Sequence, residues 1–298
     1  MIDKVNEVKN GKSNSIDIQS IDVIQCFDKL NFSETHNDLW DAKIKDNRFS
    51  LIANLDRKCR AVIKTPVGES KPFTLSDIVM QGSVFGSLKC TVQVDTLGRD
   101  CLSSEDEIGL FQYKSVVYIP PTSFVDDVLG VSNCGIEAKE LNSVINSKME
   151  TKNLSLGPDK CAKLHISKKG KEKCSNELKV HNEPMMNKEQ IKFLGDILNS
   201  EGTIDDTILD RSSRAIGLRS QLKSIITSLS LGSFYFEISL IFRESMYLNS
   251  ILVNSEAWYN ISKKNMEILE SADLAFFRLI FNSHSKTARE SFPLRQAS

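Results

Sequence analysis

The sequence predicts an α+β protein, in which hairpins and packed helices form a mixed first part and helices alone form the second. Three observations support this prediction. Alternating apolar runs and helical periods intermix up to about residue 200, two β-prone runs close tightly on an adjacent pair of aspartates, and only helical periods follow from Ile204 onward. We therefore expect two domains, over residues 1–203 and 204–298.

The first expected element is a strand over residues 16–22. Ile16 and Ile18 alternate with polar neighbours, and helical spacing follows through Phe27 and then through residues 36–44. Asp22 therefore lies where a strand ends and a turn begins. There its carboxylate either projects into a site at the sheet edge or caps the next helix.

A hairpin is expected after a short helix over residues 49–54. Residues 59–64 alternate like one strand of this hairpin, which turns at residues 65–70. Three basic side chains would line one face of it, namely Lys58, Arg60 and Lys64. A loop with two glycines, over residues 75–87, then precedes a helix. Such a loop either lets backbone N–H groups approach a phosphate or a base, or only turns the chain.

Residues 117–131 form the most informative stretch, because two apolar β-prone runs close there on Asp126 and Asp127. A tight turn between two strands would present both carboxylates at one edge of a sheet. Two ionised carboxylates side by side repel each other, and a divalent cation removes that conflict. Mg²⁺ suits such a pair because proteins bind it through one or two carboxylates together with substrate phosphates. The alternative is a surface β-turn that carries two aspartates.

The remaining elements follow in order. Residues 136–154 have the pattern of a helix, a turn after residue 156 leads into a strand, and residues 191–202 predict a strand with a tight turn. Three helical segments rich in core-type aromatics complete the chain, at residues 204–229, 234–252 and 263–281. The basic stretches 168–171 and 211–219 either contact nucleic acid or lie on solvated faces.

Composition limits the possible classes of function. The 40% hydrophobic content is enough for a sizeable core. No run approaches the roughly 18 apolar residues of a membrane span, and the first residues lack the apolar segment of a secretory signal, so we expect no membrane partner. The net charge of −1 is unusual for a protein that binds nucleic acid nonspecifically. Any such binding must come from local basic clusters.

The seven cysteines are scattered along the chain and include no Cys-x-x-Cys pair. This spacing indicates reduced thiols in an intracellular protein, and we expect a location in the nucleus or cytoplasm. It does not indicate a zinc knuckle or a disulfide framework.

Five motifs in a fixed order resemble those of reverse transcriptases, most closely the polymerases of non-LTR retrotransposons. They extend over roughly residues 16–200 of the chain. The resemblance implies a palm of antiparallel sheet and helices in the order β-α-β-β-α-β, followed by a helical thumb. The motifs are Asp22-Val23-Ile24-Gln25-Cys26-Phe27-Asp28, Gln81-Gly82-Ser83 with Gly86-Ser87, Phe124-Val125-Asp126-Asp127, Gly157-Pro158-Asp159-Lys160-Cys161 and Phe193-Leu194-Gly195-Asp196-Ile197.

The resemblance also implies catalytic and metal-binding roles for the aspartates. Asp22 and Asp126 would hold two Mg²⁺ ions about 3.5–4 Å apart, and Mn²⁺ can take their place. Asp127 would lie beside them and contribute less directly. The implied reaction is RNA-directed DNA synthesis, with an RNA template, a DNA primer and a deoxynucleoside triphosphate as partners. The sequence carries no signal for an oligomeric state.

Further residues would bind the nucleotide and the primer. The resemblance implies that Phe27 crowds a ribose 2′-hydroxyl and that Gln81 and Gly82 pack near the incoming nucleotide and the template. Lys160 would donate a proton to pyrophosphate, and Lys163 is nearly as well placed. Three residues of the last motif would hold the primer end, namely Phe193, Leu194 and Gly195.

The chain also departs from the family pattern. Only 21 residues precede Asp22, where the family carries its fingers region, so we expect an N-terminally truncated fragment of palm and thumb. One alternative is a catalytically inactive retroelement remnant that binds nucleic acid or a protein. Another is a nucleotide cyclase built on the same kind of palm. The Gln81-Gly82 and Phe193-Leu194-Gly195 stretches speak against a cyclase, because such an enzyme has no primer to hold.

Overall fold

The computed structural model describes residues 15–24, 26–75, 83–103, 121–133, 135–167, 177–258 and 261–282. The chain forms two compact units, which comprise residues 1–193 and 194–298. The division falls in the turn of a hairpin, before the predicted domain boundary at residue 203.

The first unit is built on an antiparallel sheet whose central strand is β1 (Ser15–Ile24). β1 pairs antiparallel with β7 (Asp127–Asn133) on one side and with β9 (Ala162–Ser167) on the other. β6 (Thr122–Phe124) pairs antiparallel with β7 at one edge, and β12 (Met186–Asn187) pairs parallel with β9 at the other. The strand order is therefore β12-β9-β1-β7-β6, and the short β8 (Ser155–Leu156) pairs with the end of β1.

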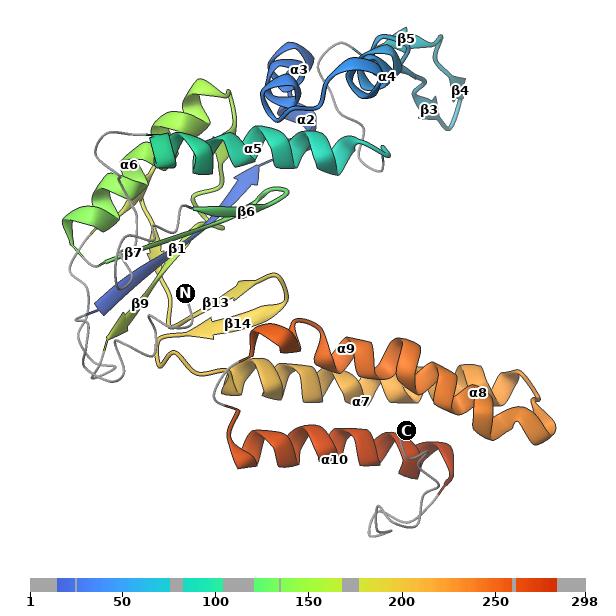
Figure 1. Cartoon of the computed structure of the whole chain (residues 1–298). Coiled ribbons are helices and arrows are strands. Elements are labelled where there is room, and N and C mark those ends of the chain that lie inside the picture. The colour runs from blue at the N-terminus through green and yellow to red at the C-terminus, as the bar shows by residue number, and fades with distance from the viewer. Residues whose placement is uncertain are drawn as a thin grey trace. The chain divides into compact units, whose positions relative to one another are not determined.

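Two helices cover the same face of this sheet, α5 (Gly86–Ser103) and α6 (Ile136–Thr151), as Figure 1 shows. Their apolar side chains form one buried cluster with Ile21 and Val23 of β1. Side chains alternate between the two faces of a strand. The neighbouring even-numbered residues of β1, including Asp22, therefore point to the opposite face. With α5 after β1 and α6 after β7, the elements follow the predicted order β-α-β-β-α-β, and the predicted fold class is confirmed.

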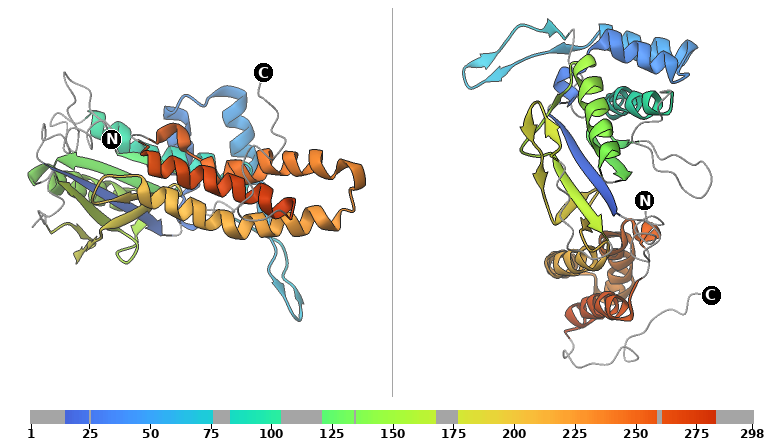
Figure 2. Two further views of the ribbon diagram at one scale, coloured as in Figure 1. Left: turned by 90° about the horizontal axis from the view of Figure 1, so that it is seen from below. Right: turned by 90° about the vertical axis from the view of Figure 1, so that its left-hand side faces the viewer.

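Three short helices follow β1, namely α2 (Cys26–Lys29), α3 (Phe32–Asp41) and α4 (Asp46–Arg57). Asn31 caps α3, because its side-chain oxygen accepts the backbone N–H of Ser33 at 2.8 Å. Four two-residue strands then form a single arm between α4 and α5, with β2 paired to β5 and β3 to β4 (Figure 2). These strands are β2 (Arg60–Ala61), β3 (Lys64–Thr65), β4 (Gly68–Glu69) and β5 (Phe73–Thr74).

Two further hairpins follow β9. The first consists of β10 (Lys179–Val180) and β11 (Glu183–Pro184), and the second of β13 (Gln190–Phe193) and β14 (Asp196–Asn199).

The second unit is helical, as predicted. Its core contains Tyr247 and Phe276, whose ring centroids lie 4.7 Å apart, and the Tyr247 hydroxyl donates to the carbonyl oxygen of Ala272 at 2.7 Å. Its elements are α7 (Asp205–Ser228), the 3₁₀ turn η1 (Gly232–Phe234), α8 (Tyr235–Phe242), the π-helical η2 (Arg243–Leu248), α9 (Asn249–Leu252), the 3₁₀ turn η3 (Ser255–Ala257) and α10 (Lys263–Ile280). Within the described residues, no helix combines the length and the apolar character needed to cross a membrane.

One expectation about the cysteines is wrong. Cys26 of α2 and Cys90 of α5 are joined in a disulfide, and both side chains are buried in the core between these helices. These two cysteines are 64 residues apart, so no short cysteine spacing in the sequence predicts the disulfide between them. Cys59 and Cys161 are free thiols.

Candidate active site

The ends of β1 and β7 bring the predicted aspartates together. Asp22 lies directly opposite Asp127 in the antiparallel register. Residues paired in this way carry their side chains on the same face, so the two carboxylates lie side by side on the face away from α5 and α6. The backbone N–H of Val23 also donates to the carbonyl oxygen of Asp126 at 3.2 Å, which fixes the turn against β1.

The turn that carries Asp126 is tight and strained. Phe124 pairs with Asp127, so Val125 and Asp126 are the two central residues of the turn. Val125 has a φ of 59°, a backbone conformation that β-branched residues rarely adopt. A positive φ at the first central position is typical of the turns that match the twist of a hairpin. The strain is therefore the consequence of placing a valine where glycine is usual.

A third segment approaches Asp22 from the turn between β8 and β9. The backbone N–H of Gly157 donates to the carbonyl oxygen of Asp22 at 3.0 Å. A Cβ atom on Gly157 would lie 3.2 Å from Ile24 Cγ1 and 3.6 Å from Asp22 Oδ2, so a larger residue would crowd the site. The sequence motif contained Gly157, but its spacing gave no sign that this residue holds the backbone of Asp22.

The structure distinguishes the two candidate lysines. Lys160 Nζ lies 3.2 Å from Asp22 Oδ2, and its side chain is 67% exposed. Lys163 pairs with Gln19 of β1, on the face that α5 and α6 cover, and it is only 4% exposed. Lys160 is therefore the lysine that the fold brings to the carboxylates.

The carboxylates disturb one another electrostatically. Burial raises the pKa of Asp127 above its usual value, and repulsion from Asp126 and Asp22 raises it further, while Lys160 acts in the opposite direction. Burial likewise raises the pKa of Cys161, whose thiol lies 4.0 Å from the carbonyl oxygen of Asp22. Excess negative charge at this edge of the sheet is the condition that a bound cation relieves.

The donor set fits a magnesium ion that also binds substrate. Among the residues that the structure describes, no group of three or more His, Cys, Asp or Glu side chains is placed to hold a metal ion. Mg²⁺ usually keeps several waters and takes one or two carboxylates, with phosphate oxygens completing its shell. Two aspartates on adjacent strand ends meet that requirement.

Of the other predicted nucleotide contacts, Phe27 packs in the first unit and two residues lie outside the described residues. Phe27 of α2 is half-buried and packs against the main core cluster, five residues after Asp22 in the chain. Gln81 and Gly82 lie outside the described residues. Ser83 is described, and its carbonyl oxygen accepts the backbone N–H of Gly86 at 3.0 Å at the start of α5.

The predicted primer residues form the turn between β13 and β14. Leu194 has a φ of 49° and Gly195 a φ of 88°, so both central residues have positive φ, as type I′ turns require. Arg211 of α7 lies against this turn, because its Nη2 atom is 3.1 Å from Asp196 Oδ1 and would be 3.0 Å from a Cβ atom at position 195. Gly195 is therefore needed both for its backbone conformation and for this close approach.

A residue that sequence reasoning missed also holds this turn. Asn254 donates from its side chain to the carbonyl oxygen of Leu194 at 2.9 Å and to Asp196 Oδ2 at 3.2 Å. Its own φ of 60° is one that asparagine tolerates, so the residue type suits this position, but the sequence gives no sign of the contact with Leu194.

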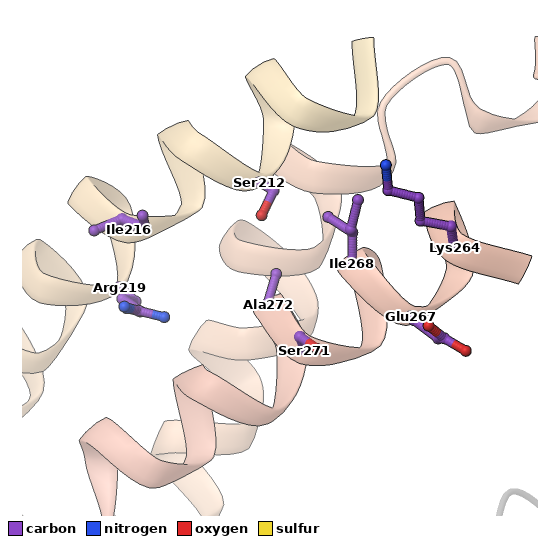
Figure 3. A pocket seen from close by; sticks show the side chains of 8 residues that line it. All are labelled: Ser212, Ile216, Arg219, Lys264, Glu267, Ile268, Ser271 and Ala272. Atoms are coloured by element: carbon purple, nitrogen blue, oxygen red, sulfur yellow. The ribbon is translucent and has the colours of Figure 1, made fainter. Parts of the chain in front are cut away.

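The arginines in the basic segment 211–219 of α7 have different surroundings. Arg214 forms an ion pair with Asp210, with Nε 3.1 Å from Oδ1. Arg219 instead lines an open groove of about 350 Å³ between α7 and α10, together with Lys264, which Figure 3 shows from close by. Arg219 also hydrogen-bonds the hydroxyl of Tyr247, and burial raises the pKa of that hydroxyl to about 12.

Comparison with known proteins shows which family model and which solved structures this chain resembles. The family model described as reverse transcriptase (RNA-dependent DNA polymerase) matches residues 2–198. Apo telomerase from Candida tropicalis is similar with a TM-score of 0.53 and 13% identity, over 94% of this chain and 46% of that chain. Telomerase from Candida albicans, in complex with the TWJ fragment of telomeric RNA, has a TM-score of 0.51 and 13% identity, over 95% of this chain and 52% of that chain.

These similarities have defined limits. At 13% identity, the likeness to the telomerases is one of fold alone. The chain spans about half the length of these telomerase chains. No curated protein matches the sequence.

Proposed function

Because the chain belongs to the reverse transcriptase (RNA-dependent DNA polymerase) family, we propose that it joins a deoxynucleotide to a primer 3′-hydroxyl on an RNA template. The single observation that carries this proposal is the pairing of Asp22 with Asp127, which brings two carboxylates and the Asp126 turn to one strand end. We further propose a non-LTR retrotransposon origin, with the chain as its palm and thumb, and an intracellular location in the nucleus or cytoplasm.

In this reaction the primer 3′-oxygen attacks the α-phosphorus of the nucleotide, and the bond to the β-phosphate oxygen breaks to release pyrophosphate. Asp22 and Asp126 would hold divalent cations, Mg²⁺ or Mn²⁺. When bound, these cations lower the pKa of the 3′-hydroxyl and neutralise the leaving group. Asp127 adds negative charge beside them. Burial raises the pKa of Asp127, and repulsion from Asp126 and Asp22, which cations would relieve, raises it further.

Lys160 is the proposed proton donor to pyrophosphate. Its ammonium group has three N–H donors. One of them donates to Asp22 Oδ2, which leaves two for a phosphate oxygen. Its mostly exposed side chain leaves room for it to turn toward a triphosphate. We propose that Phe27 bars nucleotides with a 2′-hydroxyl, and that the turn formed by Leu194 and Gly195, with Phe193 before it, holds the primer end.

The proposal is tested by single-nucleotide primer extension with Mg²⁺ on an RNA template. We expect one deoxynucleotide to be added, with a ribonucleotide used much less well because of Phe27. ATP and GTP without template or primer form the control, because a cyclase would convert them and a polymerase would not. A folded chain that binds the template–primer but never extends it would instead support the inactive, nucleic-acid-binding remnant.

A further inference from the structure

The arm between α4 and α5 is a separate two-stranded feature of the described first unit. We call residues 57–75 the basic ribbon. Its four short strands form two pairs, with Arg60 opposite Thr74 in one pair and Lys64 opposite Glu69 in the other. Between the pairs, Ser70 exchanges hydrogen bonds with the backbone of Ile63 at 2.9 Å. Figure 2 shows this ribbon projecting from the end of α4.

The ribbon is strongly basic although the chain is not. Its 19 residues include five basic side chains and one acidic one, a net charge of +4 in a chain whose net charge is −1. Glu69 Oε1 lies 3.4 Å from Lys64 Nζ. This ion pair is exposed to solvent, so it contributes little to stability. Within the described residues, no carboxylate forms an ion pair with the four other basic side chains, which are Arg57, Lys58, Arg60 and Lys71.

The ribbon also exposes apolar side chains. Ile63 is 56% exposed and Phe73 is 42% exposed. Phe73 pairs with Ala61, so strand alternation places its ring on the face opposite Arg60 in the β2–β5 pair. At the tip, Val67 is 97% exposed. A lone two-stranded hairpin is marginally stable in water, and exposed apolar residues add nothing to its stability. Apolar residues kept exposed on such an arm indicate a surface that a ligand covers.

The chemistry of the two faces favours one class of ligand. Unpaired basic side chains attract a chain of phosphates, and an exposed aromatic ring provides a platform on which an unpaired base can stack. A folded acidic protein would match the charge but not the flat, isolated ring of Phe73. We propose that the basic ribbon binds single-stranded nucleic acid, with Arg57, Arg60 and Lys71 on its phosphates and Phe73 stacked on a base. This binding needs neither the carboxylate site nor a divalent cation.

The test measures fluorescence anisotropy of a labelled single-stranded RNA in EDTA, without nucleotides. The probe is titrated with the full chain at several salt concentrations. The ribbon variant carries Arg57→Gln, Arg60→Gln and Lys71→Gln. The control variant carries Lys139→Gln, Lys179→Gln and Lys188→Gln, which remove the same charge from other exposed positions of the first unit. Circular dichroism verifies that both variants remain folded.

We expect the ribbon variant to lower the slope of log affinity against log salt by about 2, since each phosphate contact on a single strand contributes about 0.7. The control should leave the slope unchanged. Phe73→Ala should weaken binding about 5- to 150-fold without changing the slope, because it removes stacking and no charge. Equal losses in the ribbon and control variants would overturn the proposal, and so would a ribbon variant that binds like the parent.

Two further outcomes would also overturn it. If a duplex of the same sequence competes as well as the single strand, base stacking is not the mode of binding. If the ribbon substitutions change the oligomeric state measured by light scattering but not the RNA affinity, the ribbon contacts a second copy of the chain. Polymerase activity enters none of these measurements, so the ribbon and the active-site proposal can fail independently.

Discussion

Asp22 and Asp127 are directly opposite residues of two antiparallel strands, and their carboxylates share one face at the end of the sheet. The arrangement is unfavourable for stability without a cation, because burial and the neighbouring aspartates raise the pKa of Asp127. In the folded state the carboxyl therefore holds its proton over a pH range in which the unfolded chain has lost it. The free energy of unfolding falls as pH rises through that range.

We accordingly predict that Asp127→Asn stabilises the fold at neutral pH in EDTA. The gain should shrink as pH falls and vanish below about 3.8, the ordinary value for this carboxyl, where both proteins carry a neutral group. Thermal unfolding of parent and variant across pH measures this difference. Glu189→Gln, an exposed site in the same unit, serves as the control for lost charge. A variant that is less stable than the parent at neutral pH would contradict the electrostatic account.

Substitutions of Lys160 and Lys163 should affect different properties, the first the extension rate and the second the stability of the fold. Lys160→Ala removes an exposed contact with Asp22, so it should cost less than about 1 kcal/mol of stability but lower the extension rate about 100-fold. Lys163→Ala removes a buried polar side chain, so it should cost about 1–3 kcal/mol in unfolding with little effect on the rate per folded molecule. Chemical denaturation and single-turnover kinetics separate the two. The opposite assignment of effects would make Lys163 the proton donor.

The Cys26–Cys90 disulfide should stabilise the first unit substantially. A cross-link between cysteines 64 residues apart is worth about 4 kcal/mol by loop-closure entropy, so a reductant should lower the melting temperature by roughly 10 °C. The double variant Cys26→Ala, Cys90→Ala should not respond to the reductant, whereas Cys59→Ala should respond like the parent, because Cys59 is a free thiol. A parent protein that melts at the same temperature with and without reductant would contradict this prediction.

The two arginines of α7 should contribute unequally to template–primer binding. Arg214 is partly neutralised by Asp210, whereas Arg219 lines the groove between α7 and α10. We expect Arg219→Gln to lower both the affinity and its salt slope, by up to about 0.9 for one lost phosphate contact, and Arg214→Gln to have a smaller effect. Filter binding at several salt concentrations measures both. Equal binding by all three proteins at low salt would remove α7 from the nucleic-acid interface.

Local patterns sufficed to predict the elements that carry the site. Alternation predicted the strand that ends at Asp22, and two β-prone runs around Asp126 and Asp127 predicted the hairpin, because both signals lie within a few neighbouring residues. The direct pairing of Asp22 with Asp127 could not be read from the sequence, since it depends on the register of strands more than 100 residues apart.

Other features were hidden for the same physical reason. The contact between Gly157 and Asp22, the Cys26–Cys90 disulfide and the hydrogen bond from Asn254 to Leu194 all join distant parts of the sequence. The choice between Lys160 and Lys163 required knowing that Lys160 lies in the turn before β9, next to Asp22, and that Lys163 lies on β9 with its side chain toward the helices. Lys160 and Lys163 are three residues apart and look equivalent in the sequence. In the fold their side chains lie on opposite faces of the sheet.

The most direct test of the central claim is single-nucleotide primer extension on an RNA template with Mg²⁺, comparing the parent with the double variant Asp126→Asn, Asp127→Asn. Both substitutions keep the size of the side chains and remove only their charge, so the fold should persist, and circular dichroism verifies it. Our account predicts extension by the parent and none by the variant. Equal extension by both proteins would show that these carboxylates do not form the active site.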